Sequence, residues 1–156
     1  MEFLSIIQRY HLFLGCNSAL FDDVPHFAGK YLVERVIDAQ AIPATVLRPA
    51  YFMQNDLMFR DALKGGIYPQ PIGGVGVTMV DIRDIADAAV AELLRRERAP
   101  HPLPRTTIEL VGPETLTGDE IAAIWASVLG NEVRYGGNDL ATFVGNLPVV
   151  EPIGTL

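Results

Sequence analysis

The sequence predicts an α/β fold, because strand-like and helix-like runs alternate along most of the chain. A helical pattern from about Phe27 to Gln40 is followed by the aliphatic run 44–48, and two later segments, 77–94 and 107–129, each place a strand before a helix. Strands separated by helices are typical of a parallel sheet. The length of 156 residues favours one domain over residues 1–156.

Composition excludes several classes of protein. The net charge of −7 and the presence of only two lysines, Lys30 and Lys64, argue against a nucleic-acid surface, which needs clustered basic residues. The one basic cluster, Arg95, Arg96 and Arg98, lies where a helix is expected to end, which suits the helix dipole. No run reaches the ~18 apolar residues of a membrane span, and no targeting signal is evident.

Cysteine and histidine usage narrows the chemistry further. Cys16 is the only cysteine, so an internal disulfide and a cysteine zinc cluster are excluded, and a cytoplasmic protein is expected. The histidines His11, His26 and His101 have no metal-ligand spacing. We therefore expect no metal site.

The first half of the chain contains the clearest helix and strand. Phe3–Ile7 is a candidate strand, and residues 10–21 have no clear period. The helix 27–40 is expected to face a sheet through an apolar stripe of Leu32, Val33, Val36 and Ile37. Pro43 ends it, Ala44–Arg48 is the strand, and Pro49 stops that strand.

The middle of the chain continues this alternation. A helix is expected from Phe52 to Leu63, closed by Gly65 and Gly66, and followed by a Pro/Gly loop with an extended start at Ile67 and Tyr68. Val77–Val80 is a strand that leads to Asp81 as helix N-cap. The core stripe of that helix is predicted to be Ile82, Ile85, Ala86, Ala89, Val90, Leu93 and Leu94.

The last third predicts one more strand and helix. Thr107–Val111 alternates as a strand does, and Thr117–Glu120 has the sequence of a capping box. Gly130 is the expected helix stop, and Glu132–Tyr135 a short strand. The core stripe of the helix is predicted to be Ile121, Ile124, Trp125, Val128 and Leu129, with Trp125 in a packing role.

Candidate functional residues gather around the first helix and strand. His26, Lys30 and Glu34 are four residues apart, so they lie on one line along the helix. Ligands of open α/β sheets bind at the carboxyl ends of strands, and residues 48–55 leave such an end. The alternative is that Lys30 and Glu34 form an ordinary solvated ion pair. Asp81, Asp84 and Asp87 are explained by helix capping rather than by catalysis.

The order and spacing of several motifs resemble the NmrA-like group of atypical short-chain dehydrogenases/reductases. The motifs are the helix bearing Lys30, the segment TVLRPAYFM (45–53), VDIRDIA (80–86), IELVGP (108–113) and the helix start 116–120, so that the match covers about residues 24–140. This resemblance implies a Rossmann-type, doubly wound sheet with a small C-terminal α/β substrate region. It also implies binding of NADP(H) or NAD(H).

The resemblance also suggests roles for individual residues. Lys30 matches the lysine that bonds the nicotinamide ribose and is proposed as general base in some relatives, and a buried lysine can have a pKa suited to that task. Pro49, Ala50, Tyr51 and Phe52 match the segment that lines the nicotinamide pocket. The usual Tyr-x-x-x-Lys would place a tyrosine at position 26, where this chain has His26, as a substitute proton donor or as a sign of lost catalysis.

One family feature is missing from this sequence. No G-x-x-G-x-x-G turn follows a strand and opens a helix, and that turn holds the cofactor pyrophosphate. The resemblance therefore implies the C-terminal part of a partial Rossmann-type sheet, with impaired cofactor binding and self-association through an uncovered sheet edge.

Three functions follow from the resemblance. The first is an NAD(P)H-dependent oxidoreductase of the reductase or quinone-reductase kind, acting on a small molecule. The alternative is a non-catalytic redox sensor that binds NAD(P) and regulates a partner protein, which His26 would favour. A sugar-nucleotide epimerase is disfavoured by the missing Tyr-x-x-x-Lys pair, and the substrate is not specified by these residues.

Overall fold

The computed structural model describes residues 11–14 and 25–145. The chain divides into two compact units. The first contains the described residues up to Ala50 together with Val80–Gly112, and the second contains Tyr51–Met79 and the described residues from Pro113 onward. The candidate strand Phe3–Ile7 and Cys16 lie outside the described residues.

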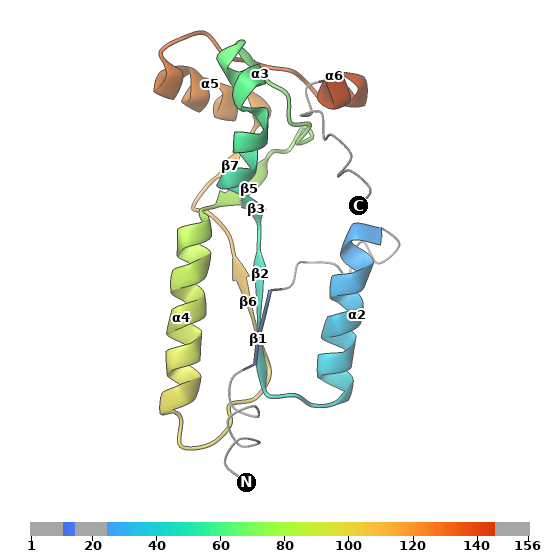
Figure 1. Ribbon diagram of the computed structural model, residues 1–156, viewed down its shortest axis with the longest axis vertical. Coiled ribbons are helices and arrows are strands. Elements are labelled where there is room, and N and C mark those ends of the chain that lie inside the picture. The colour runs from blue at the N-terminus through green and yellow to red at the C-terminus, as the bar shows by residue number, and fades with distance from the viewer. Residues whose placement is uncertain (1–10, 15–24, 146–156) are drawn as a thin grey trace, which may run out of the picture. The chain divides into compact units, whose positions relative to one another are not determined.

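The first unit is built on a three-stranded parallel sheet in the order β1-β2-β6. Its strands are β1 (His11–Leu14), β2 (Ala44–Pro49) and β6 (Thr106–Leu110). Helix α2 (Pro25–Ala39) covers one face and helix α4 (Ile82–Arg98) covers the other, as Figure 1 shows. This doubly wound arrangement confirms the predicted α/β, Rossmann-type fold.

The central strand β2 is buried because both of its faces are covered. Ala44, Thr45, Val46 and Leu47 are all 0% exposed, which explains why this strand reads as a continuous buried run rather than an alternating one. Its beginning is held by Arg96 of α4, which is 3% exposed. The Arg96 guanidinium donates to Thr45 Oγ1 (2.7 Å) and to three backbone oxygens, those of Pro43, Leu103 and Pro104. Arg96 therefore has a structural role, as was predicted for the basic cluster of Arg95, Arg96 and Arg98.

The predicted apolar stripes were too wide. Of the stripe predicted on α2, only Ile37 is buried, at 8% exposure, whereas Leu32, Val33 and Val36 are 62%, 42% and 51% exposed. The face that meets the sheet instead contains the buried carboxylate of Glu34, whose ion pairs replace apolar contacts. Ile85 on α4 is buried, but other members of the stripe on α4 and α5 are exposed: Ile82, Ala86, Val90 and Leu94, and Ile124, Val128 and Leu129.

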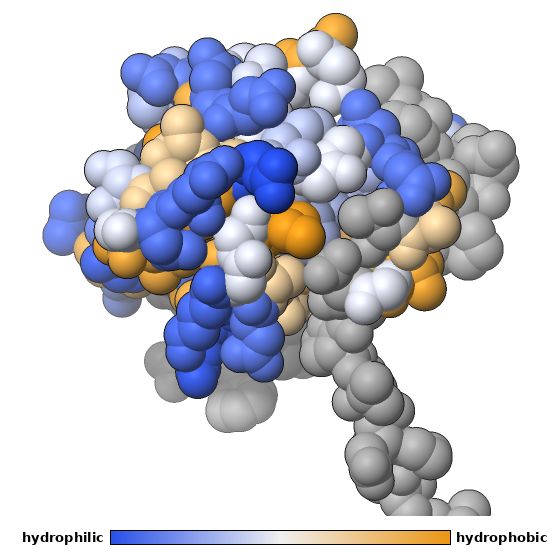
Figure 2. All heavy atoms as spheres, turned by 90° about the horizontal axis from the view of Figure 1, so that it is seen from above, coloured by the Kyte–Doolittle hydropathy of each residue, from blue (hydrophilic) through white to orange (hydrophobic). Residues whose placement is uncertain are grey.

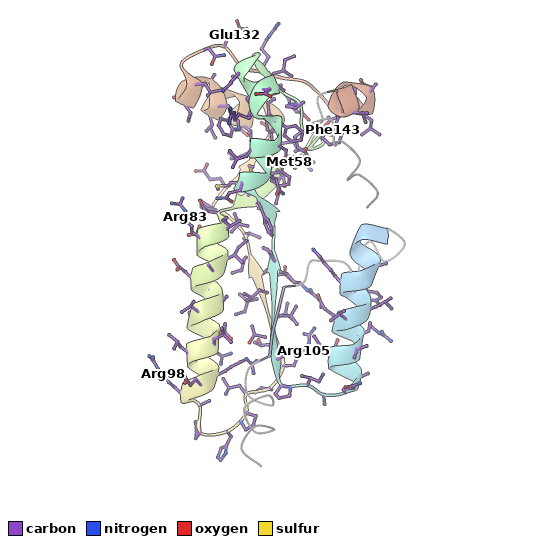
Figure 3. The ribbon with its side chains drawn as sticks, in the orientation of Figure 1. Met58, Arg83, Arg98, Arg105, Glu132 and Phe143 are labelled. Carbon is purple, nitrogen blue, oxygen red and sulfur yellow. The ribbon has the colours of Figure 1, made fainter. Side chains whose placement is uncertain are left out.

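The second unit begins with short elements. β3 (Tyr51–Phe52) leads into a 3₁₀ helix, η2 (Met53–Phe59), and then into helix α3 (Arg60–Lys64). The single helix predicted from Phe52 to Leu63 is therefore wrong in its first half, where the chain first extends and then winds more tightly. Part of the reason is that Asp56 turns inward to bond distant side chains, while Leu57 and Met58 are exposed. Figure 3 labels Met58 on this segment.

The other elements of this unit agree with the sequence more closely. They are β4 (Ile67–Tyr68), β5 (Val77–Val80, whose last residue belongs to the first unit), β7 (Thr115–Leu116), α5 (Gly118–Leu129), β8 (Arg134–Tyr135) and α6 (Leu140–Gly145). β5 lies between β3 and β7 and pairs with β7 antiparallel, and β4 pairs with β8 in parallel. Their common core is Phe59, Leu63, Tyr68, Met79, Ile121, Ala122 and Val133.

Helix α5 starts and ends as predicted. Thr117 and Glu120 form a complete capping box, and Gly130 ends the helix in the left-handed region with φ of 70°. Gly118 leaves room for the ring of Tyr135, because a Cβ at that position would lie 2.4 Å from the ring. This close approach packs β8 against the start of α5.

Among the described residues, no helix is long and apolar enough to cross a membrane. The face in Figure 2 carries hydrophobic side chains in several places between hydrophilic ones.

Candidate functional site

A network of charges holds helix α2 on strand β2. The Glu34 carboxylate, only 4% exposed, accepts hydrogen bonds from Arg48 Nη2 at 2.6 Å and Arg48 Nε at 3.2 Å. Arg105 Nη2 lies 3.4 Å from the same carboxylate, and Figure 3 places Arg105 between the sheet and α2. The hydrogen bonds that Arg48 donates to Glu34 raise the pKa of Arg48 above its usual value, so this arginine stays charged. The predicted Lys30–Glu34 ion pair is therefore wrong, since Glu34 pairs with arginines.

This anchor defines where Lys30 lies. In consecutive βαβ units the helix runs opposite to the strands, so the start of α2 is directed toward the carboxyl end of β2. Lys30 is one helical turn, about 6 Å, before Glu34, while Arg48 is the second-last residue of β2. Lys30 is therefore level with the carboxyl end of the strand. It is partly buried, and within the described parts of the chain its amine has no hydrogen-bond or ion-pair partner.

His26 lies one turn further toward the start of α2, on the same line as Lys30. The structure describes the backbone at this position as helical, which is the placement that the spacing predicts. A proton-transfer role for His26 stays a prediction.

The end of β2 offers a ligand few free backbone donors. Pro49 has no N–H, and the N–H of Ala50 donates to the carbonyl oxygen of Leu110 at 2.8 Å. Both residues are partly buried. The end of the strand therefore presents apolar side chains rather than free backbone N–H groups at these two residues.

Tyr51 and Phe52 follow directly in the chain but belong to the second unit, where they form β3. Both are partly buried. The Tyr51 hydroxyl is 3.1 Å from Asp56 Oδ1 and donates to it. The six residues predicted for the site are thus divided: Lys30, His26, Pro49 and Ala50 in the first unit, Tyr51 and Phe52 in the second.

Asp56 is a residue that the sequence did not single out. Its side chain is 2% exposed and accepts from three neutral donors: Tyr51 and Tyr68 on Oδ1, and Trp125 Nε1 on Oδ2 at 3.0 Å. Burial raises the pKa of Asp56, and the three hydrogen bonds oppose this shift. Burial, together with the neighbouring Asp56, also raises the pKa of Tyr51 and of Tyr68 above the usual tyrosine value. Both hydroxyls therefore keep their protons.

No group of three or more histidine, cysteine, aspartate or glutamate side chains that could hold a metal ion occurs among the residues described. Asp81 acts as a helix cap, as predicted: its Oδ1 accepts from the N–H of Arg83 at 2.8 Å. Its side chain also pairs with the Arg83 guanidinium at 2.6 Å.

Comparison with known proteins identifies the family of this chain. The model of the NmrA-like family matches residues 13–152, which is most of the sequence. The chain belongs to the NmrA-like family. The resemblance noted from the Lys30 helix, the 45–53 segment and the 80–86 motif is thereby confirmed.

The curated relatives are reductases. The chain is 33% identical over 129 residues to the NAD(P)H azoreductase of Xenophilus azovorans, covering 80% of this chain and 43% of that protein. It is 30% identical over 103 residues to a (4-alkanoyl-5-oxo-2,5-dihydrofuran-3-yl)methyl phosphate reductase of Streptomyces griseus subsp. griseus, covering 65% of this chain and 35% of that protein. The chain therefore spans less than half the length of the curated relatives it matches.

Solved structures support the fold. The triphenylmethane reductase of Citrobacter sp. matches with a TM-score of 0.68 and 24% identity over 86% of this chain and 47% of that one. A structure of the same enzyme complexed with NADP(H) matches with a TM-score of 0.63 over 80% of this chain and 43% of that one. A nucleoside-diphosphate-sugar epimerase from Staphylococcus aureus gives a TM-score of 0.69 at 20% identity. At these identities the likeness shows the Rossmann-type fold alone.

Proposed function

We propose that this chain forms part of an NAD(P)H-dependent reductase of small molecules, with the nicotinamide end of the cofactor at the carboxyl end of β2. The observation that carries the proposal is the place of Lys30: a partly buried amine without a partner among the described residues, one turn beyond the Glu34–Arg48 anchor. The reductase names of the relatives support the reaction class.

Each proposed residue has a task that its chemistry suits. The reduced nicotinamide supplies the hydride when the cofactor is bound. The Lys30 amine is proposed to donate hydrogen bonds to a ribose hydroxyl or to move a proton, and His26, one turn away, is proposed as the proton donor. Pro49 and Ala50 present apolar surface to the nicotinamide ring, and Tyr51 and Phe52, next in the chain, are included as cofactor contacts.

The proposal is tested in a chain fused after a dinucleotide-binding half that contains the Gly-rich turn, with NADPH and either quinones or azo dyes as substrates. Lys30→Ala is expected to lower kcat/KM by about 10²-fold or more, as removal of a positioned proton-transfer group does. Lys64→Ala is the matched control, because Lys64 is the chain's only other lysine and is exposed at the end of α3. His26→Ala then separates a proton donor, which would show a similar loss, from a bystander.

Two results would contradict the proposal. One is full activity of Lys30→Ala. The other is a fusion that binds NADPH but reduces neither class of substrate, which would favour the regulatory alternative. The unfused chain is expected to bind NADPH poorly, since it has no Gly-rich turn to hold the pyrophosphate. A calorimetric dissociation constant of about 1 μM or tighter for the unfused chain, near −8 kcal/mol, would show that this turn is not needed.

A further inference from the structure

The buried carboxylate of Asp56 needs an explanation, because residues 11–14 and 25–145 do not supply it with a cation. In the described part of the chain its hydrogen-bond partners are Tyr51 of β3, Tyr68 of β4 and Trp125 of α5, all uncharged. No arginine, lysine or second carboxylate hydrogen-bonds or pairs with it among these residues. A buried charge with only neutral partners is costly, and an apolar side chain would be cheaper for stability alone.

The direction of these hydrogen bonds is fixed by the chemistry of the groups. An ionised carboxylate only accepts, and the indole N–H of Trp125 only donates. The single hydroxyl hydrogen of Tyr51 is therefore committed to Asp56 Oδ1, while the lone pairs of the Tyr51 oxygen remain able to accept. Tyr51 cannot offer a hydrogen to another molecule as long as Asp56 is ionised.

We propose that Asp56 is a positioning residue for Tyr51, which makes Tyr51 a hydrogen-bond acceptor toward the N–H or O–H groups of a bound ligand and prevents it from acting as a proton donor. This inference rests on the proposed function, in which the ligand is the nicotinamide end of the cofactor, whose carboxamide carries N–H donors. It also means that Tyr51 does not replace the tyrosine that is missing at position 26.

Protonation of Asp56 reverses this arrangement. A protonated carboxyl group carries an O–H that needs an acceptor, and Trp125 cannot be one. Tyr51 or Tyr68 must then turn its hydroxyl to accept, so the hydrogen-bond state of the tyrosines follows the charge of Asp56. Among the residues that the structure describes, the other titratable groups in contact with Asp56 are these two tyrosines, whose hydroxyls stay protonated across this range because the pKa of each is raised.

The first experiment uses the chain itself, labelled with ¹³Cζ-tyrosine and followed by NMR over a pH series. The Tyr51 and Tyr68 signals are expected to shift together, with one midpoint above the ordinary range for aspartate. Asp56→Asn should abolish this shift, whereas Asp61→Asn, an exposed aspartate of α3, should keep it. A Tyr51 signal that titrates unchanged in Asp56→Asn would overturn the proposal.

A second variant covers the case in which Asp56→Asn fails to fold. Trp125→Phe removes one of the hydrogen bonds that lower the pKa of Asp56 and leaves both tyrosines in place. The midpoint of the Tyr51 shift should therefore move to higher pH. An unmoved midpoint would show that Tyr51 does not sense this carboxylate, and the proposal would be wrong.

The ligand arm uses nicotinamide mononucleotide, which needs no pyrophosphate site. Binding is expected on the order of millimolar, near −4 kcal/mol, with a change in the Tyr51 signal. Tyr51→Phe and Asp56→Asn should each weaken it about tenfold, and the double variant no further. Equal affinity of all variants would overturn the positioning role. If the tyrosines titrate with Asp56 but the mononucleotide does not bind, the cofactor assignment of the proposed function fails, and the link between Asp56 and Tyr51 stands.

Discussion

Replacing Glu34 by glutamine should loosen helix α2 from the sheet and with it the placement of Lys30. The Glu34 carboxylate accepts two charge-assisted bonds from Arg48, at 2.6 and 3.2 Å, and lies 3.4 Å from Arg105. Glutamine keeps the size and one acceptor oxygen but turns an N–H₂ group toward guanidinium donors. Water cannot take the place of the lost hydrogen bonds between Glu34 and Arg48, because Glu34 is only 4% exposed.

The expected cost follows from what remains after the change. Breaking a buried ion pair costs about 3–5 kcal/mol. The Arg48 and Arg105 side chains are 20% and 28% exposed, and each keeps a carboxylate, Glu109 for Arg48 at 3.1 Å and Asp38 for Arg105 at 2.6 Å. Because both arginines keep some solvent contact and one carboxylate partner, the expected loss in the free energy of unfolding is reduced to about 2 kcal/mol. With an m-value of about 2 kcal/mol/M in urea, the unfolding midpoint should fall by about 1 M.

Urea unfolding followed by circular dichroism measures this shift. Glu97→Gln, on an exposed position of α4, is the control and should change stability by less than about 0.5 kcal/mol. A second comparison tests the cause: Glu34→Leu combined with Arg48→Met should recover much of the loss, because an apolar pair leaves no buried charge. A midpoint for Glu34→Gln within about 0.2 M of the parent chain would refute the view that this carboxylate anchors α2.

Three further predictions concern stability. Arg96→Ala should cost about 3 kcal/mol in urea unfolding because it leaves the buried acceptors of Thr45, Pro43, Leu103 and Pro104 unpaired, whereas Arg98→Ala, exposed at the C-terminal end of α4 in Figure 3, should be near neutral. Gly118→Ala should lower the free energy of unfolding by about 1–3 kcal/mol, because the added Cβ would collide with the Tyr135 ring. Gly29→Ala is the control: a Cβ on this residue of α2 meets open space, so the free energy of unfolding should rise by up to about 1 kcal/mol. Equal effects of the two variants would contradict the packing of Gly118 against Tyr135. Because the pKa of Asp56 is raised on folding, the folded state holds its proton to higher pH, so stability should fall as pH rises from about 3.8 through the raised pKa; Asp56→Asn should lose this slope and Asp61→Asn keep it.

The parts of the fold that the sequence predicts well are those decided by neighbouring residues. The Asp81 cap, the capping box of Thr117 and Glu120 and the stop at Gly130 each depend on a few consecutive residues. Strand β2 was predictable for a different reason: a short, mainly aliphatic run between Pro43 and Pro49 is too short for a helix and is therefore expected to form a strand. The wide stripes failed because periodicity identifies which residues share a helix face but not how much of that face meets the sheet. On α2 the ion pairs of Glu34 determine which side of the helix meets the sheet, and their partners, Arg48 and Arg105, are 14 and 71 residues away in the sequence.

Asp56 shows why one residue next to the predicted site residue Tyr51 could not be predicted from the sequence. In the sequence it is an acidic residue in a predicted helix, where solvent exposure is the ordinary expectation. Its buried position depends on hydrogen bonds from Tyr51, Tyr68 and Trp125. These residues lie 5, 12 and 69 positions away in the sequence and belong to three different elements. Trp125 could be assigned to packing from its helical position, but its N–H partner could not. The place of Lys30 follows from spacing along one helix, whereas the hydrogen-bonding polarity of Tyr51 depends on a carboxylate that only the folded chain brings to it.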